Sequence, residues 1–305
     1  MTPTIGVFDS GFGGLTVLRA LIARLPHAQF AFLGDTARLP YGSKSRRTIA
    51  RYAAQSAQFL VREQGAQFLV IACNTASALA LDAIQKAVPV PVLGVIEPGA
   101  AAARAASRTG DVLVIATDAT VQSRAYTAAC RAHGLRVIEK ACPLLVPLVE
   151  EGWLNLAPPN QPSAAQAAFA PPQVAAQAAF ASPQVAVTAQ VIRIYLDELT
   201  AEAAAAGLHP DTLVLGCTHY PLLRPLIAQA VSPGIKVIDS AEAVAQAAFR
   251  EFALSPPIEP GPKSESADPT VCRCFATDSV EKFERLGSRF LGRPTGPVQL
   301  VDLGG

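Results

Sequence analysis

The sequence is short of charged residues. Only 16% of the 305 residues are Asp, Glu, Lys or Arg, and 25 basic residues against 24 acidic ones give a net charge of +1. Such a balanced chain has no electrostatic attraction to nucleic acid or to an anionic membrane surface. The one short basic cluster, residues 44–47, is typical of a solvated loop. We therefore expect neither nucleic acid nor a membrane as a partner.

The sequence also lacks signals for export and membrane insertion. Its first residues have no basic start and place Asp9 inside the first apolar stretch, unlike a signal peptide. Residues 152–192 carry no charge, but they are too rich in Pro, Gln, Ser and Asn for a membrane span. Six cysteines are too few for a disulfide scaffold in a chain of this length. We expect a cytoplasmic protein whose thiols stay reduced and available for chemistry.

Metal and nucleotide motifs are missing as well. Cys217-x-His219 and Cys272-x-Cys274 are present, but no C-x2-C pair or His-rich cluster accompanies them. The Gly-rich turn after Asp9 lacks the closing Gly-Lys-Ser/Thr of a phosphate loop and does not have the GxGxxG spacing. We therefore expect no metal and no cofactor.

The chain does contain a regular alternation of short apolar runs and longer helical stretches. Half of the residues are hydrophobic, and the length suits about two domains of roughly 100–200 residues. Predicted strands are residues 5–8, 29–33, 68–72, 91–95, 111–116, 136–139, 213–215, 236–238 and 270–276. Predicted helices are residues 15–25, 45–64, 76–87, 99–107, 122–133, 222–230, 241–252 and 279–291. This alternation predicts an α/β fold with mostly parallel sheets flanked by helices.

The two halves of the chain resemble each other. LVIACNTASAL at residues 69–79 matches LVLGCTHYPLL at 213–223, and GVFDSGFGGLTVLRAL at 6–21 has the shape of LVIATDATVQSRAY at 113–126. Each unit is an apolar strand, a small polar turn and a helix. The pattern indicates two similar α/β units, each with one cysteine where a strand ends, although α/β chains also look self-similar by chance.

Two segments stand outside this alternation. Residues 157–187 hold an approximate repeat of Ala, Pro and Gln, which we interpret as a partly disordered or loosely helical insertion. Residues 255–269 are rich in Pro and Ser and are typical of a linker.

Cys73 and Cys217 are the strongest candidates for chemistry. Each follows an apolar strand and precedes a helix, where the helix dipole and free backbone N–H groups stabilise a thiolate. His219 lies two residues from Cys217 and can serve as its base or charge partner. A cysteine in an apolar run is more often an inert core residue, but two such units in one chain are less easily a coincidence.

Polar residues in the turns add candidates for ligand binding. Asp9 and Ser10 precede a Gly-rich turn and a helix N-terminus, which can hold a carboxylate. The backbone near Tyr41 and Gly42, and the Tyr41 hydroxyl, could hold a polar ligand. Ordinary capping and turn chemistry is the alternative for these and for two threonines in the matching turn of the second half, Thr117 and Thr120.

Taken together, these segments resemble the glutamate racemases, a family of the cofactor-independent Asp/Glu racemase superfamily. The matching stretches span nearly the whole chain. They are GVFDSGFGG (6–14), GDTARLPYG (34–42), IACNTAS (71–77), GVIEPG (94–99), ATDAT (116–120), PLLVPLVEEG (143–152), GCTHYP (216–221) and VIDS (237–240).

The resemblance implies two pseudo-symmetric domains, residues 1–97 plus 241–305 and residues 98–240, with the active site in the cleft between them. It implies Cys73 and Cys217 as the acid/base pair, with Asp9 and His219 as their ionic helpers. The positions that match substrate-binding ones are Asp9, Ser10, Tyr41, Gly42, Asn74, Thr75, Thr117, Thr120, Thr218 and His219, with Glu151 as a further match. The substrate implied is glutamate, without a cofactor, and the resemblance allows a homodimer.

The chemistry expected of this family needs two opposed groups, because inverting a carbon centre removes a proton on one face and adds one on the other. A thiol with an ordinary pKa of roughly 8.5 offers both forms near neutral pH. The alternatives are an aspartate or related racemase with the same cysteines, a Cys-dependent hydrolase or amidase with one nucleophilic thiol, and a non-catalytic binding protein.

Overall fold

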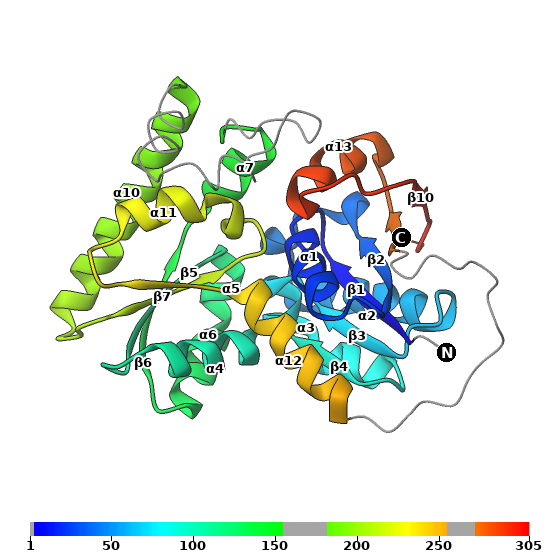
Figure 1. The fold of residues 1–305 in the computed structure, drawn as a ribbon, viewed down its shortest axis with the longest axis horizontal. Coiled ribbons are helices and arrows are strands. Elements are labelled where there is room, and N and C mark those ends of the chain that lie inside the picture. The colour runs from blue at the N-terminus through cyan, green and yellow to red at the C-terminus, as the bar shows by residue number, and fades with distance from the viewer. Residues whose placement is uncertain (1–2, 155–181, 255–271, 305) are drawn as a thin grey trace.

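A computed structural model describes residues 3–154, 182–254 and 272–304. Most of the 157–187 insertion, all of the 255–269 linker and the first residues of the predicted strand 270–276 lie outside the described residues. The remaining elements define two parallel sheets flanked by helices, so the predicted fold class is confirmed (Figure 1).

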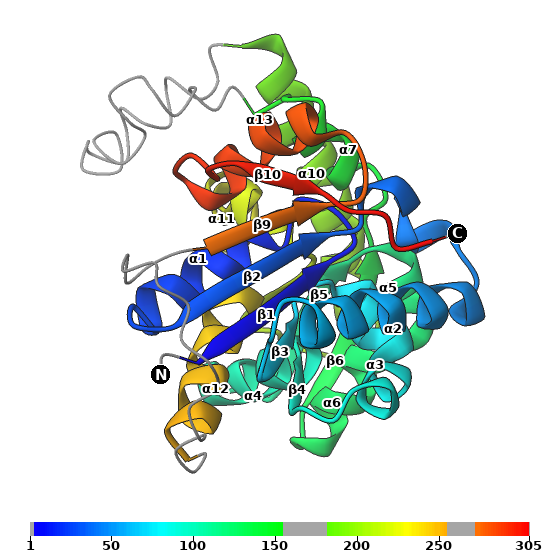
Figure 2. The same cartoon turned by 90° about the vertical axis from the view of Figure 1, so that its right-hand side faces the viewer.

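The first sheet has six strands in the order β10-β9-β2-β1-β3-β4, and every pairing is parallel. Its strands are β1 (Thr4–Asp9), β2 (Gln29–Gly34), β3 (Phe68–Ile71), β4 (Val92–Gly94), β9 (Cys272–Ala276) and β10 (Val298–Leu300). Helices cover both faces, which is why β1, β2 and β3 are nearly continuous apolar runs. Figure 2 shows this sheet with its twist.

The second sheet repeats part of the first. Its strands are β5 (Asp111–Ala116), β6 (Arg136–Ala141), β7 (Thr212–Gly216) and β8 (Lys236–Asp239). They lie in the parallel order β6-β5-β7-β8, which is the order β2-β1-β3-β4 of the first sheet. We call each sheet with its helices a lobe. The shared strand order makes β3 the counterpart of β7, so Cys73 and Cys217 follow equivalent strands.

The helices lie between the strands along the chain. They are α1 (Leu15–Arg24), α2 (Arg46–Arg62), α3 (Asn74–Ala87), α4 (Ile96–Ala106), α5 (Asp118–Ser123), α6 (Ala125–Ala132), α7 (Leu145–Glu150), α10 (Pro183–Ala205), α11 (Arg224–Ala230), α12 (Ser240–Leu254) and α13 (Val280–Leu291), with short 3₁₀ turns η1 (Thr36–Arg38), η2 (Tyr41–Ser43) and η3 (Tyr220–Leu223). Helices α2 and α3 pack together on one face of the first sheet. On its other face α1 contacts α12 and α13 (Figure 1).

Three expectations about these elements were incomplete. The helix predicted at 122–133 is two helices, because Arg124 has a left-handed backbone conformation with φ of 57°. The end of the predicted insertion is not loose, because α10 begins at Pro183. Its first turns contribute the buried side chains of Val185 and Thr188. Helix α7 and strand β10 were not predicted from the sequence pattern.

The strand order creates a switch point in each sheet. From β1 the chain moves to β2 on one side and later to β3 on the other, and the second sheet does the same around β5. Ligands of open α/β sheets bind beyond the carboxyl ends of the strands at such points. Asp9 ends β1 and Cys73 follows β3, so the two strands that meet at the first switch point carry predicted site residues.

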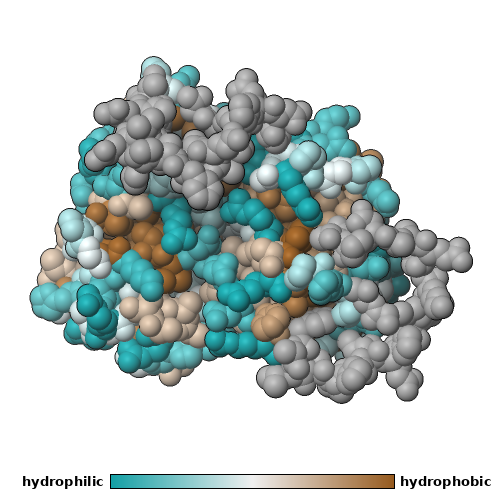
Figure 3. Space-filling model, viewed as in Figure 1, coloured by the Kyte–Doolittle hydropathy of each residue, from teal (hydrophilic) through white to brown (hydrophobic). Residues whose placement is uncertain are grey.

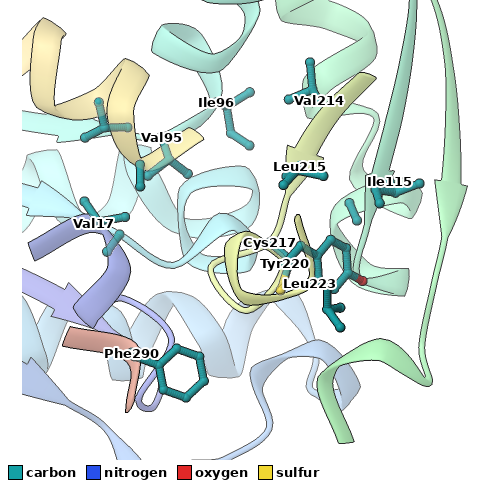
Figure 4. Close-up of a cluster of buried hydrophobic side chains, with 14 of the residues drawn as sticks. Val17, Val95, Ile96, Ile115, Val214, Leu215, Cys217, Tyr220, Leu223 and Phe290 are labelled. Carbon is teal, nitrogen blue, oxygen red and sulfur yellow. The ribbon is translucent and has the colours of Figure 1, made fainter. Parts of the chain in front are cut away.

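The hydrophobic core joins the two lobes. One buried cluster lies between the first sheet and α2 and α3, while a larger one extends from α1 and α13 into the second sheet. Figure 4 shows members of the larger cluster: Val17, Val95, Ile96, Ile115, Val214, Leu215, Cys217, Tyr220, Leu223 and Phe290. Burial of this shared apolar surface stabilises the lobes against each other at roughly 25 cal/mol per Å².

The surface is mixed. On the face shown in Figure 3, hydrophilic residues surround separate apolar areas. Large apolar side chains that stay exposed include Leu144, Trp153, Val187, Ile194, Phe249 and Leu300. No helix among the described residues is long and apolar enough to cross a membrane.

Phe283 on α13 should be one of the costliest core residues to truncate. Its side chain is fully buried, and its ring centroid lies 5.6 Å from that of Phe12 and 5.9 Å from that of Phe32. Phe283→Ala is expected to lower the free energy of unfolding by about 3–5 kcal/mol in urea titration. The control Phe249→Ala removes a ring that is 45% exposed and should change it much less. Equal losses in the two variants would contradict this packing.

Candidate active site

Cys73 lies at the N-terminus of α3. It follows the buried strand β3, and its sulfur accepts a hydrogen bond from the Ala76 amide at 3.4 Å. The Ser10 hydroxyl lies 3.3 Å from the sulfur. Cys73 is 5% exposed and belongs to the buried cluster beside α2 and α3. Its two hydrogen-bond partners nevertheless hold the sulfur in a defined position.

The surroundings of Cys73 favour its protonated form. Burial, and next the negative charge of Asp9, raise the pKa of the thiol to about 12. Hydrogen bonds from Ser10 and from the Ala76 amide act in the opposite direction but do not overcome this rise. At neutral pH Cys73 is thus a proton donor.

Cys217 has a different partner. It follows β7, and its sulfur lies 3.9 Å from Nδ1 of His219. The other ring nitrogen of His219, Nε2, lies 3.0 Å from Oε1 of Glu150. The imidazole therefore stands between a sulfur and a carboxylate, an arrangement that orients the ring as in other nucleophile–base–carboxylate sets.

His219 is held in its cationic form. Burial acts to lower its pKa, but interactions with Cys217 and Glu150 dominate and raise it to about 10. The same pair holds the pKa of Glu150 below its ordinary value in spite of burial. Nδ1 of this imidazolium faces the sulfur of Cys217.

Asp9 connects the surroundings of the two thiols. Burial raises its pKa, while His219 and the backbone amides of Gly11 and Gly14 oppose the rise. Its Oδ2 accepts a hydrogen bond from the Gly11 amide at 2.9 Å, but its Oδ1 is buried without a hydrogen-bond partner among the described residues. Asp9 acts electrostatically on both Cys73 and His219, so one carboxylate is shared by the two halves of the site.

Glycine at position 13 allows the two lobes to meet here. A Cβ on Gly13 would lie 2.2 Å from the Thr218 hydroxyl and 2.6 Å from Nδ1 of His219. The Thr16 hydroxyl also donates a hydrogen bond across the interface to the Thr218 carbonyl at 3.1 Å. The turn after β1 thus packs directly on the loop that carries Cys217.

Three of the predicted threonines form a hydroxyl cluster between the lobes. Thr75 of α3 lies 3.1 Å from Thr117 and 3.4 Å from Thr120, oxygen to oxygen, and the latter two are 2.9 Å apart. Hydroxyls both donate and accept hydrogen bonds, so this cluster can exchange its internal hydrogen bonds for ones to a carboxylate.

The Tyr41 hydroxyl has a partner within the protein, and its predicted contact with a ligand stays a prediction. It donates to Oδ2 of Asp35 at 2.5 Å, and Asp35 also accepts from Arg38 and Thr277. Gly42 is placed differently, because it lines a cavity of about 600 Å³ between the N-terminus of α2 and α5, together with Asp118 and Gln122. The lining of that cavity includes neither thiol.

The sequence reasoning missed several residues. Glu150, not the matched Glu151, contacts His219, and Glu151 is exposed. Two adjacent glutamates give no indication of which one faces inward, since that depends on how α7 docks. Asp35 and Tyr126 were also missed, because their partners are distant along the chain or recognisable only in the folded protein.

The described residues contain no group of three or more His, Cys, Asp or Glu side chains arranged to hold a metal ion. Cys272 and Cys274 lie on the same face of β9 with their sulfurs 3.8 Å apart, as the alternation of a strand predicts. They belong to β9, between β10 and β2 of the first sheet, and take no part in the arrangement around Cys73 and Cys217.

Comparison with known proteins identifies the class. The profile of the Asp/Glu/hydantoin racemase family matches residues 13–152, which include Cys73 and Glu150. Together with two parallel sheets that each present a cysteine at a strand end, this match makes the chain an amino-acid racemase.

Full-length relatives are more specific. A glutamate racemase of Koribacter versatilis is 46% identical, covering 99% of this chain and 98% of that protein, and one of Syntrophus aciditrophicus is 43% identical, covering 98% and 96%. Among solved structures, glutamate racemase isoform RacE1 from Bacillus anthracis is 33% identical with a TM-score of 0.77, covering 99% of this chain and 98% of that one. The Thermus thermophilus glutamate racemase, in complex with beta-chloro-D-alanine, is 37% identical with a TM-score of 0.75, covering the same shares. The chain belongs to the glutamate racemase family.

The charge on His219 should make stability depend on pH. Its pKa is about 10 in the folded protein against an ordinary 6.5, so the native state keeps a proton that the unfolded chain loses. This contribution is fully present below about pH 6.5 and is lost as pH rises through about 10. Chemical denaturation between these pH values should show a smaller fall in stability for His219→Gln than for the wild type. His27→Gln, at an exposed position, is the control, and an unchanged slope in His219→Gln would refute the assignment.

Proposed function

We propose that the chain interconverts L-glutamate and D-glutamate, with Cys73 and Cys217 as the acid/base pair on opposite faces of the α-carbon. The observation that supports this most is the equivalence of the two thiols. They follow corresponding strands of two sheets that share a strand order. Asp9 acts electrostatically on Cys73 and on His219, and His219 in turn contacts Cys217.

We assign the starting proton to Cys73, because burial and the charge of Asp9 raise the pKa of its thiol to about 12. We assign the starting thiolate to Cys217, whose sulfur faces Nδ1 of His219. In one direction the Cys217 thiolate removes the α-proton and the Cys73 thiol delivers its proton to the opposite face. The enzyme is then left with the charges exchanged, and the same two steps in reverse serve the other enantiomer.

The carbanion-like state between these steps needs stabilisation without a cofactor. Buried hydrogen-bond donors and the exclusion of water provide it. The side chains proposed to contact the substrate are Asp9, Ser10, Asn74, Thr75, Thr117, Thr120, Thr218 and His219, with Gly42 through its backbone. Each thiol-bearing side chain is only 5% exposed, so substrate entry requires the lobes to separate slightly.

The resemblance to glutamate racemases also suggests what the product is used for in the cell. D-glutamate made in the cytoplasm would be used for peptidoglycan. The domain division into 1–97 plus 241–305 and 98–240, and assembly as a homodimer, stay predictions.

Truncating either thiol should stop racemisation. Cys73→Ala and Cys217→Ala each remove one of the two proton carriers, and kcat for glutamate should fall by at least about 10²–10⁴-fold. Circular dichroism of L-glutamate solutions measures this directly. Cys130→Ala is the matched control, because Cys130 is fully buried on α6 and has no proposed role. Near wild-type turnover in either Cys73→Ala or Cys217→Ala would rule out a two-thiol mechanism.

The substrate and the cofactor requirement can be tested in one assay. Purified protein in D₂O, with L-glutamate or L-aspartate and no added cofactor, should racemise glutamate and introduce deuterium at the α-carbon. A chelator or a carbonyl reagent that traps pyridoxal phosphate should not slow the reaction. Faster turnover of L-aspartate would favour the aspartate racemase alternative. An acyl group trapped on one cysteine, without deuterium exchange, would favour the hydrolase.

A further inference from the structure

The side-chain amide of Asn74 is oriented by a hydrogen bond from the other lobe. The Tyr126 hydroxyl donates a hydrogen bond to Oδ1 of Asn74 at 2.9 Å. Because the carbonyl end of the amide is occupied, the Nδ2 end must point the other way. Nδ2 is buried without a hydrogen-bond partner among the described residues. Leaving a buried donor unpaired is costly, so a donor maintained next to Cys73 indicates a ligand acceptor there.

Tyr126 occupies a space made by two glycines. Its side chain is fully buried. A Cβ on Gly99 would lie 3.2 Å from one edge of the ring, and a Cβ on Gly216 would lie 3.0 Å from the other edge. Gly216 directly precedes Cys217. The same ring therefore touches the strand end that carries one thiol and, through its hydroxyl, the residue next to the other thiol.

The break between α5 and α6 sets the position of this ring. Arg124 adopts φ of 57°, so α6 starts in a new direction one residue before Tyr126. Oε1 of Glu139 on β6 then accepts hydrogen bonds from the Thr127 amide at 2.7 Å and from the Thr127 hydroxyl. The first turn of α6 is thus tied to the second sheet one residue after Tyr126.

The hydroxyl of Tyr126 stays a donor at all relevant pH values. Burial, then the nearby Cys130 and Cys217, raise its pKa above the ordinary value of 10. A tyrosine hydroxyl that keeps its proton donates that proton to a hydrogen-bond acceptor. In this structure the acceptor is the side-chain carbonyl oxygen of Asn74.

We propose that Tyr126 is a positioning residue for racemisation: it orients the Asn74 amide so that Nδ2 donates to a carboxylate oxygen of glutamate beside Cys73. This inference rests on the proposed function. Tyr126 belongs to the second lobe and Asn74 to the first, so the amide is presented correctly only when the lobes are together. Substrate binding at Cys73 is thereby linked to the position of the loop that carries Cys217.

The test is a double-mutant cycle on kcat/KM for D-glutamate. Tyr126→Phe removes one hydroxyl and should lower kcat/KM by about tenfold, mainly through KM, because a misoriented amide weakens substrate binding. Asn74→Ala should cost more. The double variant should be no worse than Asn74→Ala alone, since Tyr126 acts through Asn74.

Tyr220→Phe is the matched control. Tyr220 is also fully buried, and its hydroxyl donates to the Cys142 carbonyl at 3.1 Å, within the second lobe. Both Phe variants should lose similar thermal stability, but only Tyr126→Phe should show the KM effect. A wild-type kcat/KM in Tyr126→Phe, or effects that add fully in the double variant, would overturn the proposal.

The same cycle is measured on the dissociation constant of D-glutamate by calorimetry. If glutamate binds and the cycle is non-additive but turnover is missing, the racemase proposal fails and the role of Tyr126 stands. If turnover is normal and the cycle is additive, only the role of Tyr126 fails. If wild-type protein does not bind glutamate, both fail.

Discussion

The ionic set of Asp9, His219 and Glu150 is the constraint on which the site depends. Two carboxylates and one imidazolium are largely removed from water, which is costly unless the charges compensate one another. The set is complete only when the turn after β1 packs on the loop after β7, because Asp9 comes from the first lobe and the other two residues from the second. The lobes must therefore be docked for the charges of the site to compensate one another.

The two lobes share a strand order but differ in charge. The first places Ser10 and the Asp9 carboxylate beside Cys73, whereas the second places an imidazolium beside Cys217. The duplicated backbone thus gives the two cysteines equivalent positions, while the side chains around them differ.

Much of this fold could be predicted from the sequence, because buried parallel strands are apolar runs and the turns after them carry distinctive polar residues. Cys73 and Cys217 were chosen as candidates for that reason. Arg124 was not, because a left-handed residue inside a helical pattern leaves no signal when it is not glycine. Glu150 and Tyr126 were missed because their roles come from partners 69 and 52 residues away in the chain. The periodicity of apolar residues indicates which face of a helix or strand is buried. It does not indicate which residues of other elements that face contacts.

The contact between Phe290 and His219 has a wider consequence. The edge of this phenyl ring meets the imidazole, with ring centroids 5.0 Å apart. Phe290 belongs to α13, a helix that carries none of the residues proposed to contact the substrate. An apolar wall of this kind limits how much water can reach the histidine. Substitutions along α13 could thus shift the acidity of the site while all of its reactive groups stay unaltered, giving evolution a way to adjust the working pH from outside the catalytic motifs.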